Sequence, residues 1–241
     1  MFISKILKMK VTIHQPSYWP WLGLLDKIAK IETYIILDDV AANKASYQYR
    51  NIFFCNGRSQ FITLPVDYKM GVKINELKFK NHSWVQDHLN KLYNYYCKAP
   101  YFDDLFDELK NLYLNKSENT PIDFIIDTMK FSFSFLDINV ECVKSSELNS
   151  ELEKGDLVLD LCTKIEAKTY LSGQGANNYM TDEQIFEFEK RGIYLKWHNF
   201  NYPTYPQHKK LNFISGLACL DLFFWNGKEN SRELFWENVG K

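Results

Sequence analysis

Residues 11–23 read Val11-Thr-Ile-His-Gln-Pro-Ser-Tyr-Trp-Pro-Trp-Leu-Gly23, and this stretch decides the fold. It begins with a β-branched run, residues 11–13, which predicts a strand. A stiff loop follows, because Pro16 and Pro20 fix their own φ and keep the preceding residues out of the helical region. A helical segment, residues 24–31, comes next. Open α/β sheets bind ligands at places where a strand is followed by a loop and the start of a helix. The alternative is a rigid, aromatic entry into the core.

A second buried strand, residues 33–37, follows this helix and ends at Asp38 and Asp39. A strand, a helix and a strand within so few residues form a compact βαβ unit, which predicts a parallel sheet. The two carboxylates then lie at the carboxyl end of the second strand, where they can accept a proton or bind Mg²⁺. The alternative for this pair is a turn-forming aspartate beside a solvated one.

The rest of the chain extends this pattern to an α/β fold. We predict a mostly parallel sheet flanked by helices, with a Rossmann-like or nucleotidyltransferase-like core. A hairpin with its turn at residues 56–57 and a short strand over residues 75–79 are expected first. A helical insertion follows over about residues 82–136. The final helix is expected over residues 211–224, with its C-cap at residues 226–227.

The composition is that of an ordinary globular protein. The 241 residues carry a formal net charge of -1, so no dedicated nucleic-acid binding is expected. No apolar run reaches the roughly 18 residues that a membrane span needs. The five cysteines are widely spaced without a CxxC pair, which indicates reduced thiols in a cytoplasmic protein and no metal centre. Residues 11–241 are expected to form one domain, with residues 1–10 as an extension.

Polar and aromatic side chains in the predicted loops form the candidate site. Gly173 and Gly175 permit close backbone approach to a ligand, although a helix cap is the alternative for this loop. The proline-framed stretch over residues 200–208 has the same character as the first loop. The candidate catalytic residues are His14, Asp38 and Asp39. The candidate substrate-binding residues are Gln15, Tyr18, Trp21, Lys44, Arg50, Asn51, Ser172, Gly173, Gly175, Tyr179, Tyr205 and Gln207.

Several of these segments, taken in order, resemble the WbqC-like family. The resemblance runs from about residue 11 to residue 236 and is most specific in its first string. The segments that carry it are HQPSYWPWLG (14–23), LDDV (37–40), RN (50–51), LPV (64–66), APYF (99–102), SG (172–173) with Tyr179, YPQ (205–207), Ser215, Asp221 and NG (226–227). The resemblance implies a place in bacterial O-antigen, or lipopolysaccharide, gene clusters, where some members are proposed glycine transferases. It brings no set of catalytic residues, so the site above is inferred from side-chain chemistry.

The function that this resemblance and the candidate site predict is transfer of an amino acid or acyl group, such as glycine, to a nucleotide-linked amino sugar. His14, Asp38 or Asp39 would be the base that takes the proton of the amine. Lys44 and Arg50 would bind the pyrophosphate of the sugar nucleotide. The second partner is an amino-acid or acyl donor. ATP and Mg²⁺ are needed only if that donor is activated in the same site.

Two alternative functions remain open from the sequence. The segment His14-Gln15-Pro16 is similar to the HxGH loop of nucleotidyltransferases, whose histidine contacts phosphates, but it lacks the second histidine. Nucleotidyl transfer would release pyrophosphate and require a metal ion. The other alternative is a non-catalytic protein that binds nucleotide sugars, in which replacing His14 would change the affinity alone.

Overall fold

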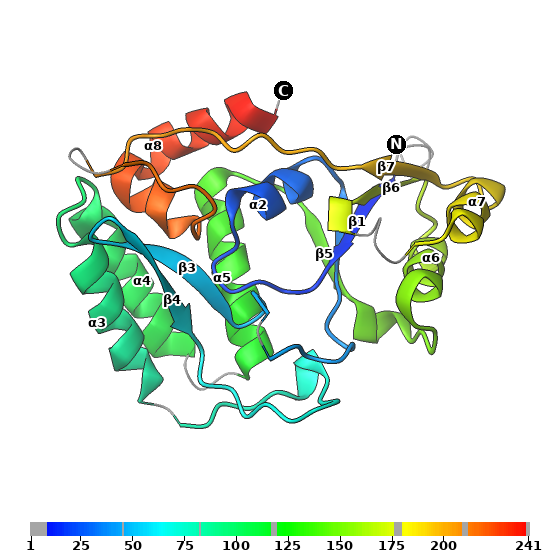
Figure 1. The fold of residues 1–241 in the computed structure, drawn as a ribbon, viewed down its shortest axis with the longest axis horizontal. Helices are drawn as coiled ribbons and strands as arrows, with labels where there is room; N and C mark the ends of the chain where they lie inside the picture. Colours follow the sequence, from blue (N-terminus) through cyan, green and yellow to red (C-terminus); the bar gives the residue numbers. More distant parts are fainter. Residues whose placement is uncertain are drawn as a thin grey trace. The chain divides into compact units, whose positions relative to one another are not determined.

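The computed structural model describes residues 9–44, 46–81, 83–116, 120–175, 180–208 and 212–239 (Figure 1). The chain separates into two compact units. Unit 1 is drawn from Met1–Gln15, Lys27–Asp39 and Asn139–Phe200, and unit 2 is drawn from Pro16–Asp26, Val40–Ile138 and Asn201–Lys241. Both units lie within the expected single domain, whose boundaries stay a prediction. None of the described helices combines the length and the apolar composition that crossing a membrane requires.

Unit 1 is built on a parallel five-stranded sheet with the order β5-β2-β1-β6-β7 (Figure 1). Its strands are β1 (Lys10–His14), β2 (Thr33–Ile36), β5 (Glu141–Lys144), β6 (Thr169–Ser172) and β7 (Tyr194–Trp197). Its helices are α6 (Lys154–Lys164) and α7 (Asp182–Lys190), and α2 (Leu22–Ala29) joins β1 to β2. The predicted α/β fold with a parallel sheet is confirmed.

The order of the strands contains a reversal beside β1. The chain places β2 and then β5 on one side of β1, and afterwards returns to place β6 and β7 on the other side. Open α/β sheets bind ligands at such a switch point, outside the carboxyl ends of the strands. The registers Val11↔Thr33 and Val11↔Tyr170 keep β2 and β6 parallel to β1. His14 and Ser172 end their strands and therefore lie at the same edge of the sheet.

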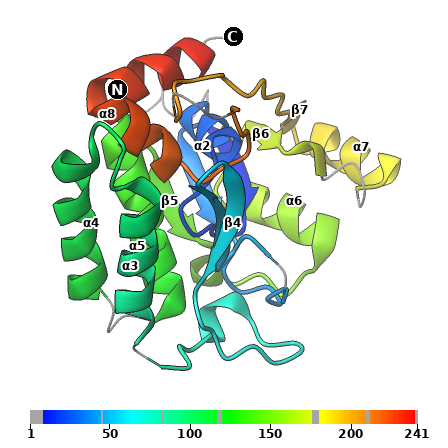
Figure 2. The ribbon, with the colours of Figure 1, turned by 60° about the vertical axis from the view of Figure 1, so that its left-hand side comes forward.

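Unit 2 combines a hairpin with helices. The hairpin consists of β3 (Arg50–Cys55) and β4 (Arg58–Thr63), and the helices are α3 (Trp84–Tyr96), α4 (Phe102–Lys116), α5 (Pro121–Leu136) and α8 (Leu220–Val239). Asn56 and Gly57 both have positive φ, as the predicted two-residue turn requires. Thr120 caps α5 by accepting a hydrogen bond from the Asp123 backbone N–H at 3.3 Å. The three helices expected near residues 82–136 are α3, α4 and α5, which lie side by side (Figure 2).

A buried aromatic network fixes the proline loop in unit 2. The Tyr18 hydroxyl lies 2.9 Å from Nδ1 of His88, whose Nε2 donates to the Thr63 carbonyl at 3.1 Å. The same hydroxyl is hydrogen-bonded to the Tyr113 hydroxyl. The Asn51 amide donates to the carbonyls of Tyr18 and Trp19 at 3.1 and 2.6 Å. The Tyr18 hydroxyl and the carbonyls of Tyr18 and Trp19 thereby gain the partners that buried polar groups require.

Two predicted elements of unit 2 differ from the structure. Residues 75–79 do not form a strand, because the chain turns through a 3-10 segment, Ile74–Glu76. The last helix begins at Leu220 rather than at residue 211, and it continues past Gly227 to Val239. Gly227 has φ 70° and ψ -179°, so the glycine breaks the helical path as a C-cap does, but a second helical segment follows at once. The sequence pattern marked the break correctly and missed the continuation.

Replacing Gly227 by alanine is expected to lower the free energy of unfolding by about 3 kcal/mol, because its conformation is essentially restricted to glycine. An added Cβ would also lie 2.6 Å from the Tyr101 ring. Gly71→Ala is the matched control, since Gly71 has positive φ with open space around the Cβ position, and we expect a loss of about 1 kcal/mol there. Urea unfolding of both variants measures the difference, and equal losses would contradict the close approach of the Tyr101 ring.

Candidate functional site

A pocket of about 370 Å³ lies in unit 1 at the carboxyl ends of β1 and β6. This is the switch point of the sheet, where the topology predicts ligand binding. Its volume is within the range of small-molecule sites. The pocket is lined by Ile13, His14, Gln15, Lys27, Leu37, Val158, Tyr170, Ser172, Gly173 and Gly175. Five predicted site residues therefore meet in one pocket.

His14 presents a neutral imidazole to this pocket. Its Nδ1 lies 2.7 Å from the carbonyl oxygen of Gln15. A carbonyl oxygen only accepts hydrogen bonds, so we assign the proton to Nδ1 and the free lone pair to Nε2. His14 is exposed to solvent in the pocket, yet desolvation by the surrounding protein atoms and the positive charge of Lys27 lower the pKa of His14 below its usual 6.5. The ring is therefore uncharged at pH 7.

Lys27 places a buried ammonium group beside His14. Lys27 is only 4% exposed, although a lysine side chain in water is charged at neutral pH. Burial lowers the pKa of Lys27 from 10.5 to about 8. An added Cβ on Gly173 would lie 3.8 Å from its Nζ, so the amine faces the loop that follows β6. Within the described part of the chain, neither a hydrogen-bond acceptor nor a carboxylate partners this amine.

The loop after β6 is held by the end of β7. The backbone N–H of His198 donates to the Ser172 carbonyl at 2.7 Å, and the Gln174 amide donates to the His198 carbonyl at 3.0 Å. Ser172 itself is fully buried. Gly175 has open space where a Cβ would lie, so its backbone remains accessible in the pocket. Tyr179, predicted as part of this loop, lies outside the described residues.

Comparison with known proteins extends over both units. The model of the WbqC-like protein family matches residues 15–233, which is most of the chain. The chain belongs to the WbqC-like protein family. It is 30% identical over 225 residues to the uncharacterized protein Rv1507c of Mycobacterium tuberculosis, covering 91% of this chain and 95% of that protein. No solved structure matches the chain. The expected family is therefore confirmed, and the comparisons name no activity for it.

Asp38 and Asp39 of this WbqC-like protein are hydrogen-bonded to the two serines that follow β5, and their catalytic role stays a prediction. Asp38 accepts hydrogen bonds from the Ser146 backbone N–H at 3.0 Å and from its hydroxyl at 2.8 Å. The Ser145 hydroxyl donates to Asp39 and bonds Asp38 as well. These bonds connect the ends of β2 and β5, and neither carboxylate lines the pocket. Among the described residues, no group of three histidine, cysteine or acidic side chains is placed to hold a metal ion.

Tyr205 and Gln207 are used within unit 2 to bind a buried acid. The Tyr205 hydroxyl and the Gln207 amide donate to Oδ2 of Asp221 at 2.9 and 2.7 Å. Burial raises the pKa of Asp221 to about 7, although these hydrogen bonds oppose the rise. The Gln207 amide also donates to the Ile214 carbonyl at 2.9 Å. The second proline loop is thereby fixed to the start of α8.

The other predicted residues of unit 2 differ in exposure. Tyr18 and Asn51 are fully buried in the network described above, which gives them a packing role. Trp21 is 37% exposed, and Lys44 is exposed. The Arg50 guanidinium lies 4.3 Å from the centre of the Phe61 ring, a cation–π contact. That the loops of His14, Asp38, Arg50, Ser172 and Gln207 share one cleft stays a prediction.

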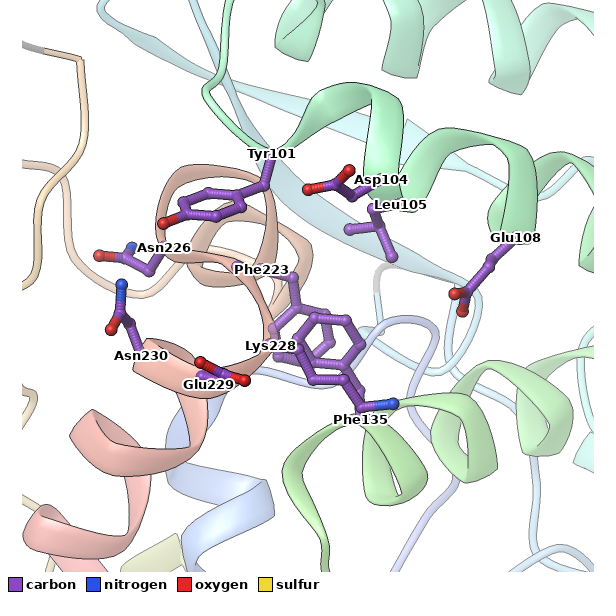
Figure 3. A pocket seen from close by; sticks show the side chains of 11 residues that line it. Tyr101, Asp104, Leu105, Glu108, Phe135, Phe223, Asn226, Lys228, Glu229 and Asn230 are labelled. Atoms are coloured by element: carbon purple, nitrogen blue, oxygen red, sulfur yellow. The ribbon is translucent and has the colours of Figure 1, made fainter.

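Unit 2 contains a second cavity of about 330 Å³ where α4, α5 and α8 meet (Figure 3). Phe135 and Phe223 stack beneath it with their ring centres 4.1 Å apart. Its lining residues are Tyr101, Asp104, Leu105, Glu108, Phe135, Phe223, Asn226, Gly227, Lys228, Glu229 and Asn230. No local sequence pattern indicates this cavity, because its lining residues lie on or beside three separate helices that meet only in the folded chain.

The sequence analysis also missed Lys27, although a signal for it exists. Lys27 follows Leu24 by three residues and precedes Ile31 by four, so helical spacing places it on the apolar face of α2. A lysine on the buried face of an amphipathic helix near a predicted strand end is uncommon enough to be a functional candidate.

Replacing Lys27 by methionine is expected to raise the free energy of unfolding at pH 7 by about 3 kcal/mol. This value follows from the fall of the Lys27 pKa from 10.5 to about 8, at roughly 1.4 kcal/mol per pH unit. The whole gain in the free energy of unfolding is expected below pH 8. It shrinks as the pH rises from 8 towards 10.5, because over this range the folded natural protein loses the Lys27 proton while its unfolded chain still binds it. Urea unfolding at several pH values measures it.

Lys30→Met is the control for this experiment, since Lys30 is only partly buried and does not line the pocket. We expect it to change stability by no more than about 0.5 kcal/mol. A Lys27→Met variant less stable than the natural protein at pH 7 would contradict the description of Lys27 as a buried charge without a compensating partner.

Proposed function

We propose that the protein is a transferase that attaches an amino acid or acyl group, such as glycine, to a nucleotide-linked amino sugar in surface-polysaccharide biosynthesis. The observation that carries this proposal is the neutral His14, whose Nε2 lone pair is available in a pocket at the switch point of the sheet. A general base in such a pocket suits a reaction in which an amine must lose a proton. Membership of the WbqC-like family is consistent with this reaction class.

The proposed step forms an amide bond. The amine nitrogen of the sugar attacks the carbonyl carbon of an activated aminoacyl or acyl donor, and its proton passes to Nε2 of His14. The bond between that carbon and the leaving group breaks, and the leaving group takes the electron pair. The backbone around Gly173 and Gly175, which lines the pocket, would donate hydrogen bonds to the oxyanion that develops on the carbonyl oxygen, and Gln15 lines the same pocket.

A second candidate function is nucleotidyl transfer. It is favoured by the position of His14 directly after β1 at the switch point, where a nucleotide phosphate can approach the ring. In that case a nucleoside triphosphate would be cleaved with release of pyrophosphate. The two reactions therefore differ in their products, which one assay can separate.

The test incubates the full chain with UDP-, dTDP-, GDP- and CMP-linked amino sugars and glycine, with and without ATP and Mg²⁺. Mass spectrometry is expected to find one sugar nucleotide that gains the mass of a glycyl group. His14→Asn should slow this transfer by about 10²- to 10⁴-fold, because asparagine can keep the hydrogen bond to the Gln15 carbonyl but has no nitrogen in the place of Nε2.

The control is His198→Asn. His198 is the second histidine described in unit 1, and unlike His14 it does not line the pocket. The transfer rate of this variant should stay within about threefold of the natural protein. Pyrophosphate release from a nucleoside triphosphate without glycyl transfer would replace this proposal by nucleotidyl transfer. If a sugar nucleotide binds but no product forms under any condition, the protein would be a non-catalytic protein that binds nucleotide sugars.

A further inference from the structure

The amine of Lys27 is buried, and it has no hydrogen-bond or ion-pair partner among the described residues. The residue is 4% exposed and lines the pocket at the switch point. None of the described residues that line this pocket carries a carboxylate. An uncompensated buried ammonium destabilises a protein, so such a group is retained where a ligand supplies the opposite charge. The ligand that fits this position is an anion.

We propose that Lys27 is the anchor for a diphosphate group, which binds between its Nζ, the backbone of the Gly173–Gly175 loop and His14. This inference rests on the proposed function for the identity of the diphosphate as part of a sugar nucleotide. Diphosphate binding itself requires no transfer activity.

Three features favour a phosphate over a carboxylate. Lysine binds phosphate as a point charge, whereas a carboxylate is matched better by the planar fork of arginine. The carboxyl ends of parallel strands at a switch point are where open α/β sheets bind the phosphates of nucleotides. Gly173 has no side chain to occupy the space near Nζ, since an added Cβ there would lie only 3.8 Å from the amine.

The size of the pocket favours a diphosphate joined to a larger group. At about 370 Å³ the pocket exceeds the space of a single inorganic ion and fits the lower range of small-molecule sites. Such a diphosphate can come from a nucleotide or from a lipid carrier. Both sources present the same group to Lys27, and they differ in what extends from it.

Binding of the anion also explains how His14 becomes an effective base. The positive charge of Lys27 helps to hold the pKa of His14 down, and a bound anion cancels that charge. The pKa values of His14 and Lys27 then both rise, so the ligand binds together with a proton. Tyr170 is the other titratable residue that lines the pocket.

The test is titration calorimetry of the full chain with inorganic pyrophosphate, UDP and geranyl diphosphate. Lys27→Met should weaken pyrophosphate binding by about tenfold to a hundredfold, as loss of a charged hydrogen-bond donor does. Lys30→Met, the matched lysine at the end of the same helix, should leave the affinity within about twofold. At pH 8 the binding enthalpy should differ between Tris and HEPES buffers, because about half a proton is taken up with the ligand.

The result that would overturn the inference is equal affinity of Lys27→Met and the natural protein, or no binding of any of the three probes. Retained cooperative unfolding of Lys27→Met excludes misfolding as the reason for lost affinity. Tighter binding of UDP than of geranyl diphosphate identifies a nucleotide as the source, and the reverse order identifies a lipid carrier.

Failure of this inference differs from failure of the proposed function. Pyrophosphate binding that depends on Lys27, without glycyl transfer to any sugar nucleotide, would overturn the transferase and keep the anion site. Unchanged glycyl transfer by Lys27→Met would overturn the anion site and keep the transferase.

Discussion

Parallel pairing on both sides of β1 is the constraint on which the pocket depends. The strand pairs with β2 along Val11–His14 and with β6 at Lys10 and Val11. Because parallel strands end at the same edge of a sheet, His14 and the residues that follow β6 line one pocket there. Helix α2 leaves the same edge and brings Lys27 to it. The chemistry of the pocket is thus a consequence of strand order rather than of one local motif.

The buried acids of this protein accept hydrogen bonds within their own unit, whereas the buried amine of Lys27 has no hydrogen-bond partner among the described residues. Asp38 and Asp39 receive hydrogen bonds from two serines, and Asp221 receives them from Tyr205 and Gln207. Each of these acids holds segments of its own unit together. Lys27 has no such partner among the described residues, and the neighbouring His14 is kept neutral. Polar groups that stabilise a fold are satisfied internally, whereas groups that act on a ligand keep unused capacity.

The sequence predicted the fold better than the site, for a physical reason. Strand and helix periodicities are local, so the βαβ start, the hairpin at Asn56-Gly57 and the three inserted helices were found. Gly227 was recognised as a break, but whether a helix resumes after it depends on packing. Asp38 was predicted as a catalytic residue because it follows a strand. Its hydrogen bond with Ser145, 107 residues later in the sequence, depends on the pairing of β2 with β5. Lys27 was missed because its helix was analysed for its apolar positions alone.

The central claim is that the pocket beside β1 binds a diphosphate through the ammonium group of Lys27, which has no partner among the described residues. A crystal structure of the full chain with UDP tests it most directly. The account predicts a phosphate oxygen within hydrogen-bond distance of the Lys27 Nζ, beside the Gly173 backbone and Nε2 of His14. A nucleotide bound elsewhere on the protein, or a carboxylate of the protein itself seated on Lys27, would contradict it.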